Sequence, residues 1–418
     1  MRVYFSAIGG VGIGPLALIA KDLGMDVLGS DVAETSITAE IAAKGIPIIM
    51  GQSQGAIKAE HAKKPIDWLV YSSSLPHDHP ELVFAREAGI RVSKRDDFIC
   101  EITKAEGLKM LAIAGTHGKT STTGMAVWLM KELGQAVSYS IGTQLTWGPM
   151  GAYQKDSTYF VYECDEYDRN FLSFHPRLSL LTSVDYDHPD IYPTRTDYQA
   201  AFRQFCGQSE AIIAWERDAA AIELAHKSNA TLFDISGVDL GSITLAGEHV
   251  RQNAWLAIQA IGSITGEAVS KLTEIMNRFP GTTRRFEKVA ANIYSDYAHH
   301  PAEIRATLQM ARELSDDVIV VYQPHQNERQ HAIKSEYGDC FASASKVYWT
   351  PTYLTRENEK LAVLTPAQLI SSLSTNNAVP AELDLDLART LKAEAASGKL
   401  ILALGAGPID SWVRGHLA

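Results

Sequence analysis

The sequence predicts an α/β protein made of three consecutive units, and three observations lead to this prediction. Short apolar runs with the composition of buried strands recur along all 418 residues. Segments with a helical spacing of apolar residues alternate with these runs, as they do around parallel sheets. Several runs end in glycines, carboxylates or histidines, and α/β proteins bind ligands at the carboxyl ends of their strands. We place the units at residues 1–108, 109–280 and 281–418.

The composition is that of an ordinary globular protein, with 46% hydrophobic and 21% charged residues. A formal net charge of −11 argues against a general nucleic-acid binder, which needs a basic face. It leaves room for a small anionic substrate in a local basic pocket. We expect no membrane span and no signal peptide, because no apolar stretch has the required length and pattern. Four scattered cysteines without a CxxC pair suggest a reducing, cytoplasmic location.

The first unit opens with the pattern of a nucleotide-binding βαβ segment. The apolar strand Val3–Ile8 runs into the glycine turn Gly9–Gly14, and a helix and a second strand ending at Asp31 follow. A diphosphate on the helix N-terminus, with Asp31 near a ribose or base, is the functional interpretation. A turn that is glycine-rich only for packing is the alternative. The residues assigned to this anion site are Gly10, Val11, Gly12, Ile13, Asp31, Ser72 and Ser73.

The second unit opens with a candidate phosphate-binding loop. A buried strand at Met110–Ala114 leads into a glycine turn, and a helical pattern continues to Leu133. The loop is shorter than the general P-loop, with two residues between its glycines, and an ordinary strand-to-helix turn is the alternative. We expect Lys119 to reach the outer phosphates and the Thr120 hydroxyl to hold Mg²⁺. The loop residues are Gly115, Thr116, His117, Gly118, Lys119, Thr120 and Ser121.

Two further strands of this unit end in carboxylates. Strand 158–162 is followed by Glu163 and strand 178–184 by an acidic run containing His188. Because Mg²⁺ takes few protein oxygens and several waters, we assign Glu163 and His188 to metal. The neighbouring acids Asp165, Glu166 and Asp168 fit a solvated acidic face equally well. Asn253, in a predicted helix further on, is either a ligand or a core residue.

The third unit repeats the strand–helix pattern and collects histidines and arginines after its strands. Strand 293–297 leads to His299 and His300, and strand 317–322 leads to His325 and Arg329. The pair Arg284-Arg285 lies before these strands and has the charge to hold a phosphate. We expect no zinc here, because neither HExxH nor cysteine spacing is present.

Over nearly its whole length the chain resembles the Mur ligases of peptidoglycan synthesis. The resemblance is specific because several motifs occur together and in family order. These motifs are Gly115-Thr116-His117-Gly118-Lys119-Thr120, Glu163-Cys164-Asp165-Glu166, Asp187-His188, Thr283-Arg284-Arg285-Phe286, Asp296-Tyr297-Ala298-His299-His300-Pro301 and Gln323-Pro324-His325.

The resemblance implies an N-terminal Rossmann-like domain for a UDP-sugar, a central P-loop ATPase-like parallel sheet, and a C-terminal Rossmann-like domain for an amino acid. It implies an ATP- and Mg²⁺-dependent ligase that joins L-alanine to the lactyl carboxylate of UDP-N-acetylmuramate through an acyl phosphate. The expected partners are these small molecules, without nucleic acid or a membrane span. The expected assembly is a monomer or homodimer.

The resemblance also assigns roles to individual residues. Thr120 and Glu163 are expected to hold one Mg²⁺ and His188 a second. It implies that the adenine, phosphates and ribose of ATP are bound by Asn253, Arg285 and Asp296. The catalytic set is expected to be Lys119, His188, His325 and Arg329, and the amino-acid site Tyr297, His299, His300 and Arg329.

Departures from the family pattern leave alternatives open. Sister ligases carry a carbamylated lysine where this chain has Arg203, so we expect no carbamylation. Tyr167, Ala298 and Asn327 resemble a relative that joins a recycled tripeptide to the same UDP-sugar. We favour L-alanine, because Arg329 can pair with the carboxylate of a small amino acid. An oxidoreductase and a non-catalytic nucleotide-binding protein are the other two hypotheses, and neither accounts for the intact loop and carboxylates.

Overall fold

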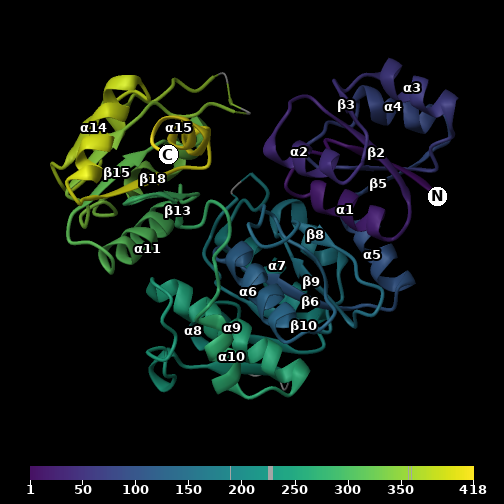
Figure 1. Cartoon of the computed structure of the whole chain (residues 1–418), viewed down its shortest axis with the longest axis horizontal. Helices are drawn as coiled ribbons and strands as arrows, with labels where there is room; N and C mark the ends of the chain where they lie inside the picture. The colour runs from purple at the N-terminus through teal and green to yellow at the C-terminus, as the bar shows by residue number, and fades with distance from the viewer. Residues whose placement is uncertain (189, 225–228, 356, 359) are drawn as a thin grey trace. The chain divides into compact units, whose positions relative to one another are not determined.

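The computed structural model describes residues 1–188, 190–224, 229–355, 357–358 and 360–418. The chain divides into two compact units, Met1–Ile243 with Asn253–Pro280 and Thr244–Gln252 with Gly281–Ala418. The first unit contains two sheets and the second contains one, and helices cover all three (Figure 1). The predicted α/β class with largely parallel sheets is confirmed. No helix among the described residues is long and apolar enough to cross a membrane.

The first sheet is parallel, with the strand order β3-β2-β1-β4-β5. Its elements are β1 (Arg2–Ser6), α1 (Gly14–Asp22), β2 (Asp26–Asp31), α2 (Ser36–Ala43), β3 (Ile48–Met50), α3 (Gln54–Lys63), β4 (Trp68–Tyr71), α4 (Pro80–Glu87), β5 (Arg91–Lys94) and α5 (Arg95–Ala105). Successive side chains of β1 point to opposite faces. Tyr4 packs in one core with residues of α3 and α4, which lie side by side in Figure 1. Val3 and Phe5 pack in the other with residues of α1 and α5.

The order of this sheet reverses at β1, since α1 leads from β1 to its neighbour β2, whereas α3 leads from β3 to β4 on the other side of β1. The glycine turn follows β1, and Ser72 follows its neighbour β4. Ligands of open α/β sheets bind at such a reversal, outside the carboxyl ends of the strands. The residues assigned to the first anion site therefore lie at the edge where the fold favours binding.

The second sheet has the order β12-β11-β10-β6-β9-β7-β8 and is parallel except where β8 joins β7. This part of the chain contains β6 (Lys109–Ala114), α6 (Lys119–Glu132), β7 (Ser138–Ser140), β8 (Gly151–Ala152), β9 (Tyr159–Glu163), β10 (Leu178–Leu181), α7 (Arg195–Gln208), β11 (Ile212–Trp215), α8 (Glu216–Ala221), β12 (Ala230–Phe233), α9 (Glu248–Thr265) and α10 (Val269–Met276), with 3-10 turns at Tyr167–Ser173 and Ile235–Gly237. Strand β6 lies between β10 and β9. The loop after β6 therefore emerges between the segments that follow the other two strands.

The third sheet has the order β13-β14-β18-β15-β16-β17 and is parallel apart from β13. Its elements are β13 (Glu287–Ala290), β14 (Ile293–Asp296), α11 (Pro301–Arg312), β15 (Val318–Tyr322), α12 (Asn327–Ile333), β16 (Lys346–Trp349), α13 (Pro366–Ile370), β17 (Ala378–Pro380), α14 (Leu385–Ala396), β18 (Leu400–Leu404) and α15 (Ile409–His416), with a 3-10 turn at Lys334–Glu336. Strand β18 lies between β14 and β15. The histidine-containing segments after β14 and β15 thus leave the sheet at one edge, on either side of Gly405.

Residues 244–252 pack with this second unit, although we placed them in the central domain. The reason is a polar contact with the end of helix α11. Arg251 donates to both carboxylate oxygens of Glu313 at 2.8 and 2.9 Å. The backbone N–H of Gly247 donates to the same carboxylate at 2.9 Å.

Candidate active site

The predicted phosphate loop forms the turn between strand β6 and helix α6. Gly115 and Gly118 have φ angles of +140° and +81°, which other residues reach only with strain. A Cβ atom at Gly118 would lie 2.5 Å from the Nδ2 atom of Asn253, and one at Gly115 would lie 2.1 Å from the Oγ1 atom of Thr182. The glycines therefore let the loop backbone approach its neighbours, and Asn253 of helix α9 lies directly against the loop.

Lys119 is the first residue of α6, and its ammonium group is held inside the loop. It donates to the carbonyl oxygens of Gly115 at 2.6 Å and Thr116 at 3.2 Å. The two carboxylate oxygens of Glu166 lie 2.8 and 3.0 Å from the same nitrogen. Burial by itself lowers the pKa of Lys119, but the carboxylates of Glu166 and Asp165 raise it above its ordinary value. The lysine is therefore charged.

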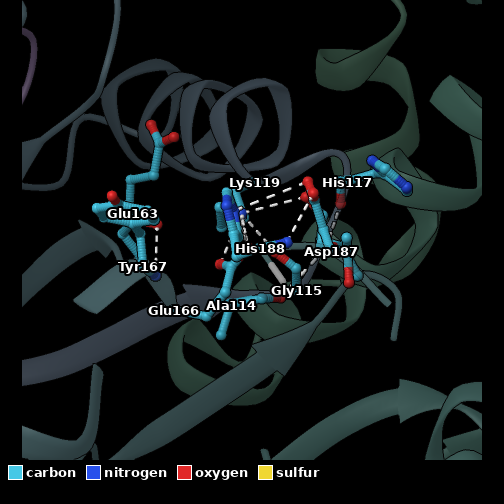
Figure 2. Close-up of polar contacts among 12 residues, drawn as sticks. Ala114, Gly115, His117, Lys119, Glu163, Glu166, Tyr167, Asp187 and His188 are labelled. Atoms are coloured by element: carbon cyan, nitrogen blue, oxygen red, sulfur yellow. Dashed lines mark hydrogen bonds and ion pairs between the residues drawn. The ribbon is translucent and has the colours of Figure 1, made fainter. Parts of the chain in front are cut away.

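Glu166 is a residue of the candidate site whose role the sequence left undecided between a site residue and a solvated acidic face. Its residue surface is 0% exposed, so it is no part of a solvated acidic face. The Nε2 atom of His188 lies 3.5 Å from one of its carboxylate oxygens. The hydroxyl of Tyr192 donates to its backbone carbonyl at 2.6 Å. Glu166 thus contacts both Lys119 and His188, and Figure 2 shows the polar contacts around these three side chains.

His188 follows strand β10 and has a left-handed backbone, with φ of +57°. The ring of Tyr167 packs edge-on against its imidazole, with 5.1 Å between the centroids. Burial lowers the pKa of His188, while Glu166 and Asp187 raise it, and the net direction is upward. The structure therefore brings His188 to the phosphate loop, as the acidic run after β10 predicts.

Thr120 and Glu163 form the second polar pair of the loop. The Thr120 hydroxyl donates to a Glu163 carboxylate oxygen at 2.7 Å, and the Gly142 N–H donates to the other at 2.7 Å. Two adjacent oxygens of this kind fit Mg²⁺, which needs few protein ligands. No group of three or more His, Cys, Asp or Glu side chains suited to a metal occurs among the described residues. A cation at Thr120 and Glu163 would complete its coordination with phosphate oxygens and water.

Thr116 and His117 connect the loop to the segment after β10. The Thr116 hydroxyl lies 2.7 Å from the carbonyl oxygen of Asp185, to which it donates. The His117 N–H donates to the Ser183 hydroxyl at 2.9 Å. Ser121 lies on the first turn of α6 and is partly buried. These contacts make Thr116 and His117 supports of the loop conformation.

The first anion site lies around the turn after β1. Asp31 is 9% exposed, and one of its carboxylate oxygens accepts the Gly9 N–H at 2.8 Å. The other oxygen accepts the N–H groups of Val32 at 2.8 Å and Ala33 at 3.3 Å. Asp31 therefore fixes the turn through backbone contacts. Gly10, Val11, Gly12 and Ile13 form the turn itself, and Ser72 and Ser73 follow β4.

In the compact unit that contains Gly281–Ala418, the residues assigned to the amino-acid site lie after β14 and β15. Nη1 of Arg329 lies 2.8 Å from Nε2 of His299. Arginine only donates, so Nε2 accepts, and the imidazole proton is on Nδ1, 3.1 Å from the carbonyl oxygen of Tyr297. The rings of His299 and His325 have centroids 5.9 Å apart. Arg329 thus has a neutral histidine as a close neighbour.

Other predicted residues of this unit have structural contacts. The carboxylate oxygens of Asp296 accept the N–H groups of Phe286 and Ala298, both at 2.7 Å. Arg284 donates to the carbonyl oxygens of Gly405 at 3.0 Å and Gly407 at 3.2 Å. Arg285 lies over the Tyr297 ring, 5.0 Å from its centroid, and the His300 imidazole caps helix α11 through the Ala302 N–H at 3.4 Å.

Two residues that set this chain apart from family patterns also have defined contacts. The Asn327 side chain donates to the Ala362 carbonyl at 3.1 Å and accepts the Leu364 N–H at 2.9 Å. Arg203, on α7, donates to the Ile222 carbonyl at 3.2 Å and pairs with Glu223 at 3.3 Å. Asn327 therefore holds a neighbouring segment of its own unit.

Three family models match consecutive parts of the chain. They are the Mur ligase family catalytic domain at residues 2–106, the Mur ligase middle domain at residues 113–239, and the Mur ligase glutamate ligase domain at residues 284–407. The first match contains the whole first sheet and the third match the whole third sheet, and the middle match contains the second sheet apart from residues 109–112 of β6.

Relatives match over nearly the full length of the chain. The UDP-N-acetylmuramate–L-alanine ligase of Frankia casuarinae is 30% identical, covering 98% of this chain and 96% of the relative. The ligase of the same name from Lactobacillus delbrueckii subsp. bulgaricus is 31% identical, with the same coverage. Among solved structures, the UDP-N-acetylmuramate-alanine ligase of Thermotoga maritima has a TM-score of 0.80 at 25% identity, covering 100% of this chain and 98% of that one. A murein peptide ligase of Psychrobacter arcticus, at 22% identity, has a TM-score of 0.70, covers 100% of this chain and 98% of that one, and shares the fold.

Proposed function

The chain belongs to the Mur ligase family, and from this premise we propose that it joins L-alanine to the lactyl carboxylate of UDP-N-acetylmuramate at the expense of ATP. The observation that carries this proposal is that Lys119 and Thr120 are the first two residues of α6, and that the Thr120 hydroxyl is hydrogen-bonded to Glu163 at the end of β9. A charged lysine and a potential metal-binding oxygen pair at a helix N-terminus are what phosphoryl transfer requires.

The proposed reaction has two steps. An oxygen of the lactyl carboxylate attacks the γ-phosphorus of ATP, the bond to the bridging oxygen breaks, and ADP leaves. The amine nitrogen of alanine then attacks the acyl carbon of the resulting acyl phosphate. The tetrahedral intermediate expels phosphate, the nitrogen loses a proton, and an amide remains.

The residues of the loop would act on the first step. Lys119 and the N–H groups at the start of α6 would neutralise the charge that spreads over the transferring phosphoryl group. Mg²⁺, which Thr120 and Glu163 would hold, would add its own positive charge to the phosphate oxygens. Asn253, which lies against Gly118, is placed to contact the nucleotide, and we assign Arg285 and Asp296 to the phosphates and ribose on the family pattern alone.

The UDP-sugar is proposed to bind the first sheet, with its diphosphate on the turn Gly9–Gly14 and Ser72 and Ser73 nearby. The support is the position of this turn at the reversal of strand order, ahead of a helix N-terminus. Asp31 would act indirectly, because its carboxylate accepts the Gly9 N–H and so fixes the turn.

For the amine we propose L-alanine over a tripeptide. Arg329 lies beside a neutral His299 and has the planar fork that pairs with a carboxylate. Asn327 was one of the residues that favoured the tripeptide, but its side chain is hydrogen-bonded to the backbone of Ala362 and Leu364. The full-length relatives at 30% and 31% identity bear the alanine ligase name. His325 would lie near the acyl group, and His300 would shape the site as a helix cap.

We further propose that the protein works in the cytoplasm, where ATP and nucleotide sugars are available, as a monomer or homodimer. The direct test is phosphate release from ATP in the presence of Mg²⁺, with each substrate omitted in turn. We expect release only with UDP-N-acetylmuramate and L-alanine together. Release with the tripeptide and none with L-alanine would contradict the choice of amine. Release that needs neither substrate would contradict the ligase assignment.

A further inference from the structure

Arg95 is a largely buried cation that contacts Gly12, in the turn after β1, and Asp165, in the segment after β9. It is the first residue of helix α5, directly after β5. A Cβ atom built at Gly12 would lie 2.4 Å from its Nη1 atom, 3.4 Å from its Cζ atom and 3.6 Å from its Cδ atom. The guanidinium therefore packs against the glycine turn after β1. A side chain larger than hydrogen at Gly12 would displace it.

The hydrogen bonds of Arg95 leave part of its guanidinium available. Nη2 donates to a carboxylate oxygen of Asp165 at 2.9 Å, and the side chain is 15% exposed. Nε is buried and has no hydrogen-bond partner among the described residues. A guanidinium carries five N–H donors, and buried donors are almost always satisfied. The guanidinium therefore has donors beyond the one given to Asp165, and it lies beside a glycine turn of the anion-binding type.

Asp165 connects Arg95 to the phosphate loop. It lies two residues after Glu163, and its second carboxylate oxygen accepts the Tyr167 N–H at 3.1 Å. Its negative charge also contributes to the raised pKa of Lys119. One carboxylate therefore acts on both the arginine at the glycine turn and the lysine of the phosphate loop.

We propose that Arg95 is an anion-binding residue of the sugar-nucleotide site, and that it contacts the diphosphate resting on the turn Gly9–Gly14. This inference rests on the proposed function, which places a nucleoside diphosphate at that turn. The planar fork of arginine matches two phosphate oxygens, and a charge-assisted bond of this kind is strong in a partly buried position. Asp165 accepts one N–H of the guanidinium and so competes with a phosphate for this group.

A purely structural role is the alternative, in which Arg95 only joins helix α5 to the segment after β9. A second ion pair already joins these segments. Nζ of Lys94 lies 2.6 Å from a carboxylate oxygen of Asp168, and both side chains are about one-third exposed, at 37% and 33%. Lys94 pairs with Asp168, whereas the described atoms nearest to Gly12 belong to Arg95, so Lys94 is the matched control for Arg95.

The test is calorimetric titration of the full-length chain, without Mg²⁺, with UDP and separately with ATP. We expect Arg95→Ala to weaken UDP binding at least 10-fold and to change ATP binding less than 2-fold. Arg95→Lys should be intermediate, because it keeps the charge and loses the fork. Lys94→Ala should bind both nucleotides like the unaltered chain. Unchanged ATP binding by Arg95→Ala shows that the variant is folded.

Asp165→Asn separates the two roles of Arg95. If Arg95 binds the diphosphate, Asp165→Asn removes a competing carboxylate, and UDP binding is retained or strengthened. If Arg95 is only structural, Asp165→Asn and Arg95→Ala weaken UDP binding alike, and the inference is overturned. UDP binding by Arg95→Ala at the affinity of the unaltered chain would also overturn it. Failure of the unaltered chain to bind UDP, with ATP binding intact, would overturn the sugar-nucleotide assignment of the turn itself.

Discussion

The ammonium nitrogen of Lys119 lies 2.8 Å from a carboxylate oxygen of Glu166, a residue with no exposed surface. The lysine that we expect to act on ATP is thus one half of a buried ion pair. Removing one partner of such a pair leaves the other charge buried and uncompensated, which is strongly destabilising. Substitutions here therefore change stability and turnover together unless both residues are altered.

We expect Lys119→Ala to lower turnover by roughly 10²-fold or more, because a charge that stabilises the transferring phosphoryl group is lost. The same substitution should lower the free energy of unfolding by about 3–5 kcal/mol, because Glu166 stays buried without its partner. Adding Glu166→Gln should restore most of the stability and none of the turnover. Thermal melts and phosphate release, measured on the two single variants and the double variant, separate these effects. Near-normal turnover in folded Lys119→Ala would contradict the phosphate-loop assignment.

Glu163→Gln should raise the Mg²⁺ concentration needed for half-maximal phosphate release about 10-fold or more, because a neutral amide binds a hard cation less well than a carboxylate. The Thr120 hydroxyl can still hydrogen-bond to the amide oxygen, so the loop should keep its shape. Asp168→Asn is the control, since Asp168 pairs with Lys94 at 2.6 Å and lies 33% exposed. Equal Mg²⁺ requirements in both variants would exclude Glu163 as a ligand.

Arg329→Ala should raise the KM for L-alanine about 10-fold or more while leaving the KM for ATP unchanged. The reason is the loss of a charge-assisted pair with the substrate carboxylate. Arg305→Ala is the matched control, because Arg305 pairs with Asp339 at 3.0 Å on the exposed surface of the same unit. Initial rates at varied L-alanine concentrations provide the measurement, and an unchanged KM for L-alanine would argue for a different carboxylate partner.

The lowered pKa of Glu313 predicts a pH-dependent contribution to the stability of the compact unit that contains Gly281–Ala418. Hydrogen bonds from Arg251, with further ones from Gly247 and Gln309, lower the pKa of Glu313 from 4.5 to about 2. A lowered pKa means that the contribution is fully present above pH 4.5 and is lost as the pH falls toward 2. Because the carboxylate is 28% exposed, we expect about 1 kcal/mol after screening by solvent.

Comparing thermal melts of the unaltered chain and Glu313→Gln between pH 7 and pH 3 checks this. The difference in Tm should be constant down to pH 5 and shrink below pH 4.5. Gln309→Ala, which removes a weaker partner of the same carboxylate, should give a smaller difference with the same pH profile. A difference that does not vary with pH would show that the ion pair contributes nothing.

The strands and the phosphate loop were predictable because their signals are local. The apolar run before Gly115 forms β6, and the helical pattern after Gly118 forms α6. The predicted strands 158–162 and 317–322 form β9 (Tyr159–Glu163) and β15 (Val318–Tyr322), with bounds that differ by one residue. Periodicity and glycine positions determine such elements within a few residues of sequence. The strand order, which places β6 between β9 and β10, depends on contacts between distant segments, and periodicity and motif spacing do not determine it.

The roles of single acids in one run were not predictable in this way. Asp165, Glu166 and Asp168 are neighbours with the same charge, yet Glu166 is buried against Lys119, while Asp165 and Asp168 pair with Arg95 and Lys94. Left-handed backbone at Asp168, with φ of +54°, breaks any regular alternation of faces along the run. Burial here is decided by partners from other segments, which composition and spacing do not identify.

Arg203, on helix α7, bears on whether turnover depends on dissolved carbon dioxide. Its guanidinium contacts Ile222 and Glu223, at the position where sister ligases carry a modified lysine. A lysine forms a carbamate by attack of its neutral amine on carbon dioxide, whereas a guanidinium stays protonated at any physiological pH. Turnover by this chain should therefore be the same in degassed buffer and in buffer enriched with bicarbonate. Its rate in the cell would then not depend on the concentration of carbon dioxide.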